Sequence, residues 1–361
     1  SPPPPVCPPA AAARLRCLIP WLHHHHHPPS SLRTPPPSPG LATLLGFFDQ
    51  DTYGGSDPDA PRFIATTASA FSLPTAMPDI DKWVPLDCRH GRALFFRRKS
   101  HELLVWEPLT GERWLVPKPP GYLLHYLYPN AAAVCAVKGC DHCCCHGGPF
   151  LVVFVFSDDD SHFGLWEEVS ACVYSSVTGE WGDWRTIDID ASAVRDVPSI
   201  LVGRNLYFRL VGGQQILEYD LDRHSMALIW PPLDQFGKFD EYGLAEDDGQ
   251  LGVVVLAGST LSLWSTDQKD DDARWARSWV MDLDHPLQLQ AKQAVQVLGF
   301  AEGVNVTFIL AGDYIFTIEL KSGKVKKYCK WREFRMVLPL VIFYRPGPVR
   351  RQGGEEVPSA N

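Results

Sequence analysis

Hydrophobic residues in this chain occur in short runs of about four to eight, and from residue 41 onward clusters of polar turn residues separate these runs. The runs are rich in Val, Ile, Leu, Phe, Tyr and Trp, and several alternate apolar with polar positions, which is typical of β-strands. A helical period sustained over about ten residues is missing from the sequence. The pattern therefore predicts an all-β fold.

The strands come in recurring pairs joined by a turn. In three pairs a glycine closes the turn, and we predict positive φ for these structural turn residues, Gly111, Gly179 and Gly323, because glycine adopts that conformation without steric cost. The recurring segments are "LLVWEPLTGERWLVP", "VYSSVTGEW", "LEYDLDRHSMALIWPP", "LSLWSTDQ" and "IELKSGKVKKY".

The spacing of these pairs predicts the architecture. Their marker residues lie 68, 45, 45 and 54 residues apart, and are Trp106, Tyr174, Tyr219, Trp264 and Ile318. A period of about 40 to 50 residues in an all-β chain is typical of a β-propeller with four strands per blade. We predict a kelch-like propeller of about six blades over residues 41–345, with the sixth built from residues 44–67 and the last strand at 337–344. The alternative is a pair of stacked β-sandwiches.

The two ends of the chain differ from this pattern. Residues 1–40 hold 13 of the 32 prolines, an alanine run and five consecutive histidines. Such a segment buries too little apolar surface to offset its ordering entropy, so we predict a disordered Pro/Ala/His-rich linker. The polar residues 346–361 are predicted to form a disordered tail.

The net charge, the length of the apolar runs and the cysteines limit which partners and which cellular location we expect. The net charge of -9 disfavours nucleic acid, because phosphate binding requires a basic face. No apolar run approaches the roughly 18 residues of a membrane span, so we expect no membrane partner. Ten cysteines without framework spacing argue against a disulfide scaffold and predict a cytoplasmic or nuclear location.

One segment, "CDHCCCHGG", carries possible metal ligands. Cys140 and Cys143 have the spacing of a zinc knuckle, and His142, Cys144, Cys145 and His146 add donors. A second knuckle is missing and the side chains of consecutive cysteines diverge. We therefore predict an exposed loop between two strands, without a metal, and keep a metal site as the alternative.

Catalytic chemistry finds little support in the sequence. Nucleophile-elbow, P-loop and dinucleotide-binding patterns are absent. Asp188 and Asp190 share one strand face, and paired acids perform glycoside hydrolysis, but solvated strand charges are the better explanation. We predict no catalytic residues and no cofactor. Acidic stretches at 158–160, 246–248 and 270–272 are either solvated loop tips or a recognition side for a basic partner.

Several motifs in order resemble a known family. They are "LLGFF", "PRF", "LDCRHGRALFF", "LLVWEPLTGERWLVP", "VYSSVTGEW", "LVGRNLYF", "ILEYDL", "LSLWS" and "IFTIELKSGKVKKY", and they span residues 41 to about 330. The chain resembles the F-box-associated propeller domain of plant F-box proteins, especially those of grasses.

The resemblance implies a function. It implies a non-catalytic protein-binding propeller that acts as substrate receptor of a ubiquitin ligase of the SCF type, with a protein substrate as partner. Residues 1–40 do not resemble an F-box, so we expect binding to the adaptor Skp1 only if an F-box lies upstream. The alternatives are a propeller enzyme of glycosidase or oxidase type and a degenerate paralogue without a target.

Overall fold

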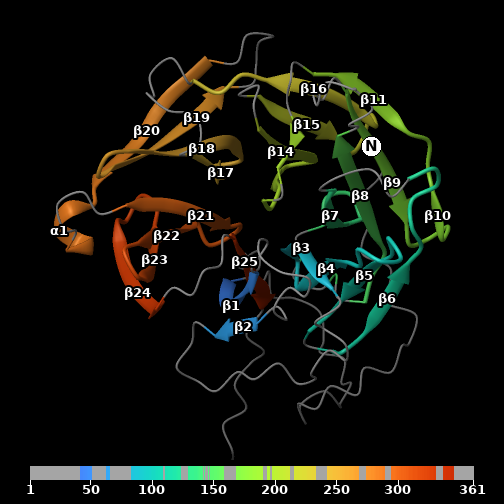
Figure 1. Cartoon of the computed structure of the whole chain (residues 1–361), viewed down its shortest axis with the longest axis horizontal. Coiled ribbons are helices and arrows are strands. Elements are labelled where there is room, and N and C mark those ends of the chain that lie inside the picture. Colours follow the sequence, from blue (N-terminus) through green and yellow to red (C-terminus); the bar gives the residue numbers. More distant parts are fainter. Residues whose placement is uncertain are drawn as a thin grey trace, which may run out of the picture.

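The computed structural model contains six antiparallel β-sheets around one central axis, so the chain folds as a six-bladed β-propeller (Figure 1). This confirms the predicted fold class, and the alternative of two stacked sandwiches is wrong. The predicted linker, 1–40, and tail, 346–361, lie outside the described residues. The structure describes residues 41–50, 62–65, 83–108, 110–122, 129–140, 142, 145, 147–157, 168–189, 193–195, 197–211, 215–232, 242–267, 274–288, 294–330 and 336–344.

The first two blades follow each other along the chain. Blade I consists of β3 (Val84–Arg89), β4 (Arg92–Phe96), β5 (Leu103–Trp106) and β6 (Arg113–Val116). Blade II consists of β7 (Asn130–Cys135), β8 (Phe150–Ser157), β9 (Glu168–Ser175), β10 (Glu180–Trp181) and β11 (Arg185–Asp188). Its outer strand is divided, because β10 and β11 both pair with β9.

Three further blades continue the ring. Blade III consists of β12 (Ala193–Val194), β13 (Ile200–Val202), β14 (Asn205–Val211), β15 (Ile216–Asp220) and β16 (Ser225–Ile229). Blade IV consists of β17 (Tyr242–Asp247), β18 (Gln250–Ala257), β19 (Thr260–Asp267) and β20 (Arg274–Asp282), followed by the short α1 (Asp284–Leu287). Blade V consists of β21 (Val295–Ala301), β22 (Val306–Ala311), β23 (Tyr314–Glu319) and β24 (Lys324–Lys330).

Blade VI joins the two ends of the propeller, as the sequence predicts. It contains β1 (Leu41–Gln50) between β2 (Arg62–Ala65) and β25 (Met336–Tyr344). β1 and β25 pair over their whole length, from Leu41 opposite Tyr344 to Gln50 opposite Met336. The described residues contain three strands of this blade, one fewer than the four predicted for each blade.

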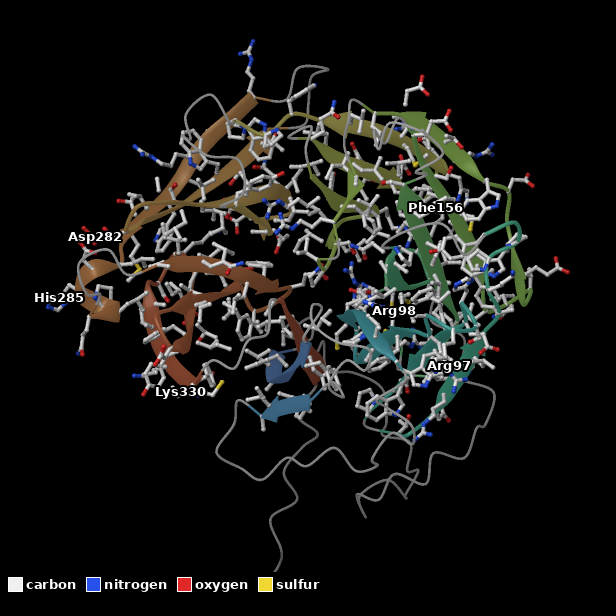
Figure 2. All side chains as sticks on the ribbon, viewed as in Figure 1. Arg97, Arg98, Phe156, Asp282, His285 and Lys330 are labelled. Carbon is white, nitrogen blue, oxygen red and sulfur yellow. The ribbon has the colours of Figure 1, made fainter. Side chains whose placement is uncertain are left out.

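The core lies between neighbouring blades. In β1 the adjacent Phe47 and Phe48 point to opposite faces, because side chains alternate along a strand. Phe47 packs on Phe308 of blade V with ring centroids 5.2 Å apart, and Phe48 packs on Phe95 of blade I at 5.9 Å. Buried apolar side chains of neighbouring blades pack against one another. Asp282, His285 and Lys330 lie at the outer rim (Figure 2). One strand thus seals the ring on both sides.

The antiparallel order of the strands fixes where the turns lie. Within a blade, the turn between the first and second strands and the turn between the third and fourth strands fall at the same end of the sheet. We call this end the turn face. Gly111, Gly179 and Gly323 lie there, with φ of 79°, 72° and 69°, and the cysteine segment joins β7 to β8 at the same face.

Candidate functional site

A cavity of about 290 Å³ lies on the central axis near the turn face. It is lined mainly by the carboxyl ends of the inner strands and the turns that follow them, and by the middle of β25. The main contributing segments are Asp87–His90, Ser199–Gly203, Phe300–Gly303 and Leu338–Val341. Since His142 of the β7–β8 loop and Glu246 of blade IV also line it, all six blades contribute to this channel cavity.

A buried arginine organises one wall of the channel cavity. Arg89 donates from Nε and Nη2 to the two carboxylate oxygens of Asp87, at 2.9 and 2.8 Å. Its Nη2 also donates to the carbonyl oxygen of Ser199, at 2.8 Å, and its Nη1 lies 3.5 Å from Glu302 Oε1. Asp87 in turn accepts from the amide of Ala133 at 2.9 Å. The network therefore joins blades I, II, III and V across the axis.

These groups affect one another's ionisation. Burial alone would lower the pKa of Arg89, but the charges of Asp87 and Glu302 outweigh it and raise that pKa. Burial raises the pKa of Glu302, while the positive charge of Arg89 and a hydrogen bond from the Leu201 amide, at 2.8 Å, oppose the shift. With Asp87 and Glu246, three carboxyl groups and one guanidinium line the cavity, which makes it acidic.

A second acidic group lies beside the cavity in blade IV. Lys321, in the β23–β24 turn, contacts Asp247 at 2.8 Å and Asp248 at 2.7 Å. Burial opposes ionisation of Asp247, but hydrogen bonds from Lys321, Ser265 and Ser278 together lower its pKa. The three acids of the stretch 246–248 therefore have two different environments. Glu246 lines the cavity, while its two neighbours form ion pairs with a lysine of blade V.

The turn between β3 and β4 carries His90 and Gly91 at positive φ, 51° and 75°. Successive positive φ values are those of a type I′ turn, which matches the twist of a hairpin. The turn brings the ring of His90 onto the ring of His142, with centroids 3.6 Å apart and planes 11° from parallel. The β7–β8 loop therefore rests on the rim of the channel cavity.

The same loop gathers sulfur and nitrogen donors. Cys135, Cys140, His142 and Cys145 place one ligand atom each within 4.8 Å of one another. We call this the cysteine cluster. Cys140, His142 and Cys145 were candidate metal ligands from the sequence, and the structure brings them together with Cys135. The other candidates, Cys143, Cys144 and His146, lie outside the described residues.

Other sequence candidates lie apart from the channel cavity. Asp188 is an exposed residue at the end of β11, the divided outer strand of blade II, and Asp190 lies outside the described residues. The acidic stretches 158–160 and 270–272 also lie outside them. Gly111, Gly179 and Gly323 support turns between outer strands and do not line the cavity.

Sequence reasoning missed the contacts that cross between blades. Arg89 lies inside the segment "LDCRHGRALFF", but its partners Ser199 and Glu302 are more than a hundred positions away, so no local pattern indicates them. The sequence did contain a signal that Cys135 would join the cysteine cluster. It ends an apolar strand ten residues before Cys145, and a hairpin between β7 and β8 returns the chain to that point.

The comparisons with known proteins do not define a family. No family model and no curated protein matches the chain. Among solved structures, a nidogen/laminin complex chain is 11% identical, with 82% of this chain and 97% of that chain covered and a TM-score of 0.43. A protein of unknown function from Bacteroides caccae is 11% identical, with 84% and 99% covered and a TM-score of 0.41.

The fold and the site together define the class of protein, which is a six-bladed β-propeller with an acidic channel cavity at its turn face. Over the described ranges, the one helix is far too short to cross a bilayer.

Proposed function

We propose that the chain is a non-catalytic protein-binding propeller whose channel cavity receives a basic side chain of its partner. The observation that carries this proposal is the lining, which holds the three carboxyl groups of Asp87, Glu246 and Glu302 and, histidines aside, the single cationic side chain of Arg89. Complementary charge orients a partner and speeds its association. A side chain ending in a guanidinium or ammonium group fits this lining.

The size of the cavity supports a side chain as its occupant. Pockets for drug-sized ligands and cofactors span about 300–1,000 Å³. The channel cavity, at about 290 Å³, lies just below that range. It has room for one extended side chain, while the turns around it offer a wider surface for the rest of a protein partner.

The hydrogen bonds of the three acids favour binding over catalysis. A glycosidase-type mechanism needs one carboxyl group to donate a proton and another to attack or activate water. Here Asp87 accepts from Arg89 and from the Ala133 amide, and Glu302 accepts from the Leu201 amide. Glu246 accepts from the Gly249 amide at 2.6 Å. These bonds hold the carboxyl groups in place as fixed negative charges.

The sequence resemblance supports a finer version of the proposal. The chain would serve as the substrate-recognition module of an SCF-type ubiquitin ligase in the cytoplasm or nucleus, with a protein substrate bound at the turn face. Skp1 would attach through an F-box and not through the propeller, whose blades supply none of the F-box helices.

The binding proposal is tested with matched peptides. Pools of short fluorescent peptides with one central arginine, citrulline or glutamate are titrated with the full chain and followed by anisotropy. Citrulline keeps the shape of arginine but lacks its charge. We expect arginine pools to bind at least about tenfold more tightly, equivalent to about 1.4 kcal/mol. Equal binding of arginine and citrulline pools contradicts the proposal.

Variants then place the binding at the cavity. Glu246→Gln and Glu302→Gln should each reduce the preference for arginine, because each removes one negative charge from the lining. Glu180→Gln is the matched control, since Glu180 is exposed on β10, away from the axis. Equal loss in all three variants indicates general surface attraction and rejects the channel cavity as the site.

The ligase version has its own test. Purified Skp1 is incubated with the chain and with a fusion that carries an F-box directly ahead of Leu41. We expect Skp1 to be retained by the fusion alone. Retention by the unfused chain shows a docking element elsewhere and contradicts this version, whereas the peptide experiment is unaffected by either outcome.

A further inference from the structure

The cysteine cluster has the composition and spacing of a closed metal site. A zinc ion held by thiolates at about 2.3 Å and by an imidazole nitrogen at about 2.0 Å has ligand atoms about 3.5–3.8 Å apart. The four ligand atoms of the cluster already lie within 4.8 Å of one another, and Cys145 Sγ lies 3.8 Å from His142 Nδ1. Side-chain adjustments of about 1 Å bring all four onto one ion.

The geometry removes both reasons that the sequence offered against a metal. A second knuckle is not needed, because Cys135 at the end of strand β7 and Cys145 of the loop complete the set with Cys140 and His142. The problem of adjacent cysteines does not arise among the four, since one or more residues separate each ligand from the next.

The surrounding protein holds the loop in place. The Ala136 amide donates to the Pro149 carbonyl at 3.1 Å, which closes the base of the loop. Arg92 of blade I donates from Nη2 to the carbonyls of Cys145 and Gly148, both at 2.8 Å. Outer contacts of this kind fix the orientation of metal ligands and contribute to affinity.

Two ligands are also oriented directly. The ring of His142 is stacked on His90, which restricts its rotation, and the His142 amide donates to Cys140 Sγ at 3.4 Å. An amide donor to sulfur favours the thiolate form that a metal requires. Cys135 and Cys145 are buried, so two of the three thiolates are shielded from solvent.

We infer that Cys135, Cys140, His142 and Cys145 form a structural Zn²⁺ site that fixes the β7–β8 loop against the channel cavity. Three sulfurs and one imidazole in a tetrahedral set are typical of zinc, and four protein ligands leave no open position for a substrate. The site is thus structural and not catalytic. Because His142 also lines the channel cavity, the ion would fix one part of the cavity wall.

The first test measures metal content. The full chain, purified under reducing conditions and without affinity tags, should contain about one equivalent of zinc. Cys135→Ser and Cys145→Ser should reduce this at least about tenfold, because the loss of even an outer-shell partner costs about 10–100-fold in metal affinity. Cys329→Ser is the matched control, because Cys329 is a partly buried cysteine of blade V outside the cluster, and this variant should retain the metal.

Variants of the candidates from the sequence alone separate the possible ligand sets. Cys143→Ser and His146→Ala should keep the zinc. If Cys143→Ser loses it while Cys135→Ser retains it, the ion is held by the Cys140–Cys143 knuckle and the proposed set is wrong. Copper or iron in place of zinc overturns the identity of the metal.

A second measurement does not depend on variants that fold poorly. The native chain is stripped with a chelator and reconstituted with Co²⁺. Tetrahedral coordination with three thiolates should give intense visible absorption and a charge-transfer band scaled to three Co–S bonds. A spectrum of octahedral cobalt, or a disulfide among these cysteines in the reduced preparation, contradicts the inference. Neither result bears on whether the channel cavity binds basic peptides.

Discussion

Two buried arginines stand at the ends of one tight turn and hold different parts of the molecule. Arg89 ends β3 and Arg92 begins β4, and they face each other across the two-residue turn. Arg89 points to the axis, where it binds Asp87, Ser199 and Glu302. Arg92 binds Glu107 within its own blade and two carbonyls of the β7–β8 loop.

The difference between them lies in access to water. Arg89 and Asp87 are only 3% and 2% exposed, but Arg89 lines the channel cavity and its other acidic partner, Glu302, is 21% exposed, so this network borders solvent. Arg92 and Glu107 are both about 1% exposed, and the guanidinium lies over the ring of Phe150 at 5.4 Å. Removing a partner costs most where the remaining charge stays dry. Blade I therefore uses arginine in two ways. Arg89 joins several blades at the solvent-bordering cavity, and Arg92 holds the β7–β8 loop from a position closed to solvent.

The largest effect is expected at the dry site. Arg92→Met leaves the Glu107 carboxylate buried without its cation and two carbonyls without a donor. We expect a loss of about 3–5 kcal/mol in the free energy of unfolding. Denaturant unfolding followed by fluorescence measures it. Adding Glu107→Gln should recover part of the loss, and an unchanged midpoint in Arg92→Met refutes the role assigned to this pair.

The hydrated site should respond less. Arg89→Met removes hydrogen bonds to Asp87 and Ser199, and water in the channel cavity can replace part of them. We expect a loss of about 1.5–3 kcal/mol, the range for hydrogen bonds to charged groups. The same denaturant experiment applies. A loss equal to or greater than that of Arg92→Met contradicts the distinction in water access.

The contribution of turn geometry alone is measured at a turn far from both arginines. A Cβ at Gly179 would meet no atom within 4 Å, so only its φ of 72° resists substitution. Gly179→Val should cost about 1–2 kcal/mol, while Gly179→Asn should cost a few tenths, because Asn tolerates this conformation. Equal stability of the two variants, in thermal unfolding, argues against backbone strain as the cause.

The smallest effect concerns pH. Because burial raises the pKa of Glu302 in the folded state, its carboxyl group contributes most stability below its unfolded pKa of about 4.3. That contribution declines as the pH rises through the folded value. Glu302→Gln should lack the decline, which unfolding midpoints at a series of pH values will show.

A carboxyl group with the opposite shift provides the control for that series. The lowered pKa of Asp247 means that its contribution is present above the unfolded value and is lost as the pH falls through the folded one. Asp247→Asn should therefore flatten the acid side of the curve. Parallel curves for wild type and both variants contradict the assigned directions.

The repeated strand pairs could be predicted because their signals are local. Trp106 before a turn and Gly111 within it lie in one short segment, and the spacing of such segments gives the propeller. Closure of the ring by β1 and β25 also followed from the length of the chain that remained after five blades. These features depend on the period of side chains and on the backbone freedom of glycine.

The site could be predicted only in fragments. Cys140 and His142 were recognised by spacing, but the cluster also needs Cys135, whose position depends on the return of the β7–β8 hairpin. The contact of Arg89 with Glu302 depends on the curvature of the whole ring, which brings blades I and V to one axis. Side-chain type indicates that a charge needs a partner, but the closed ring determines which one it finds.

The pairing of β1 with β25 has a mechanical consequence. Leu41, where the propeller begins, is opposite Tyr344, where it ends, so both ends leave the ring at the same place. A pulling force applied to the two ends would load the bonds between these strands one after another, as in unzipping, rather than all together in shear. The ring would then open at blade VI at low force, while the other blades, each made of consecutive strands, keep their hydrogen bonds.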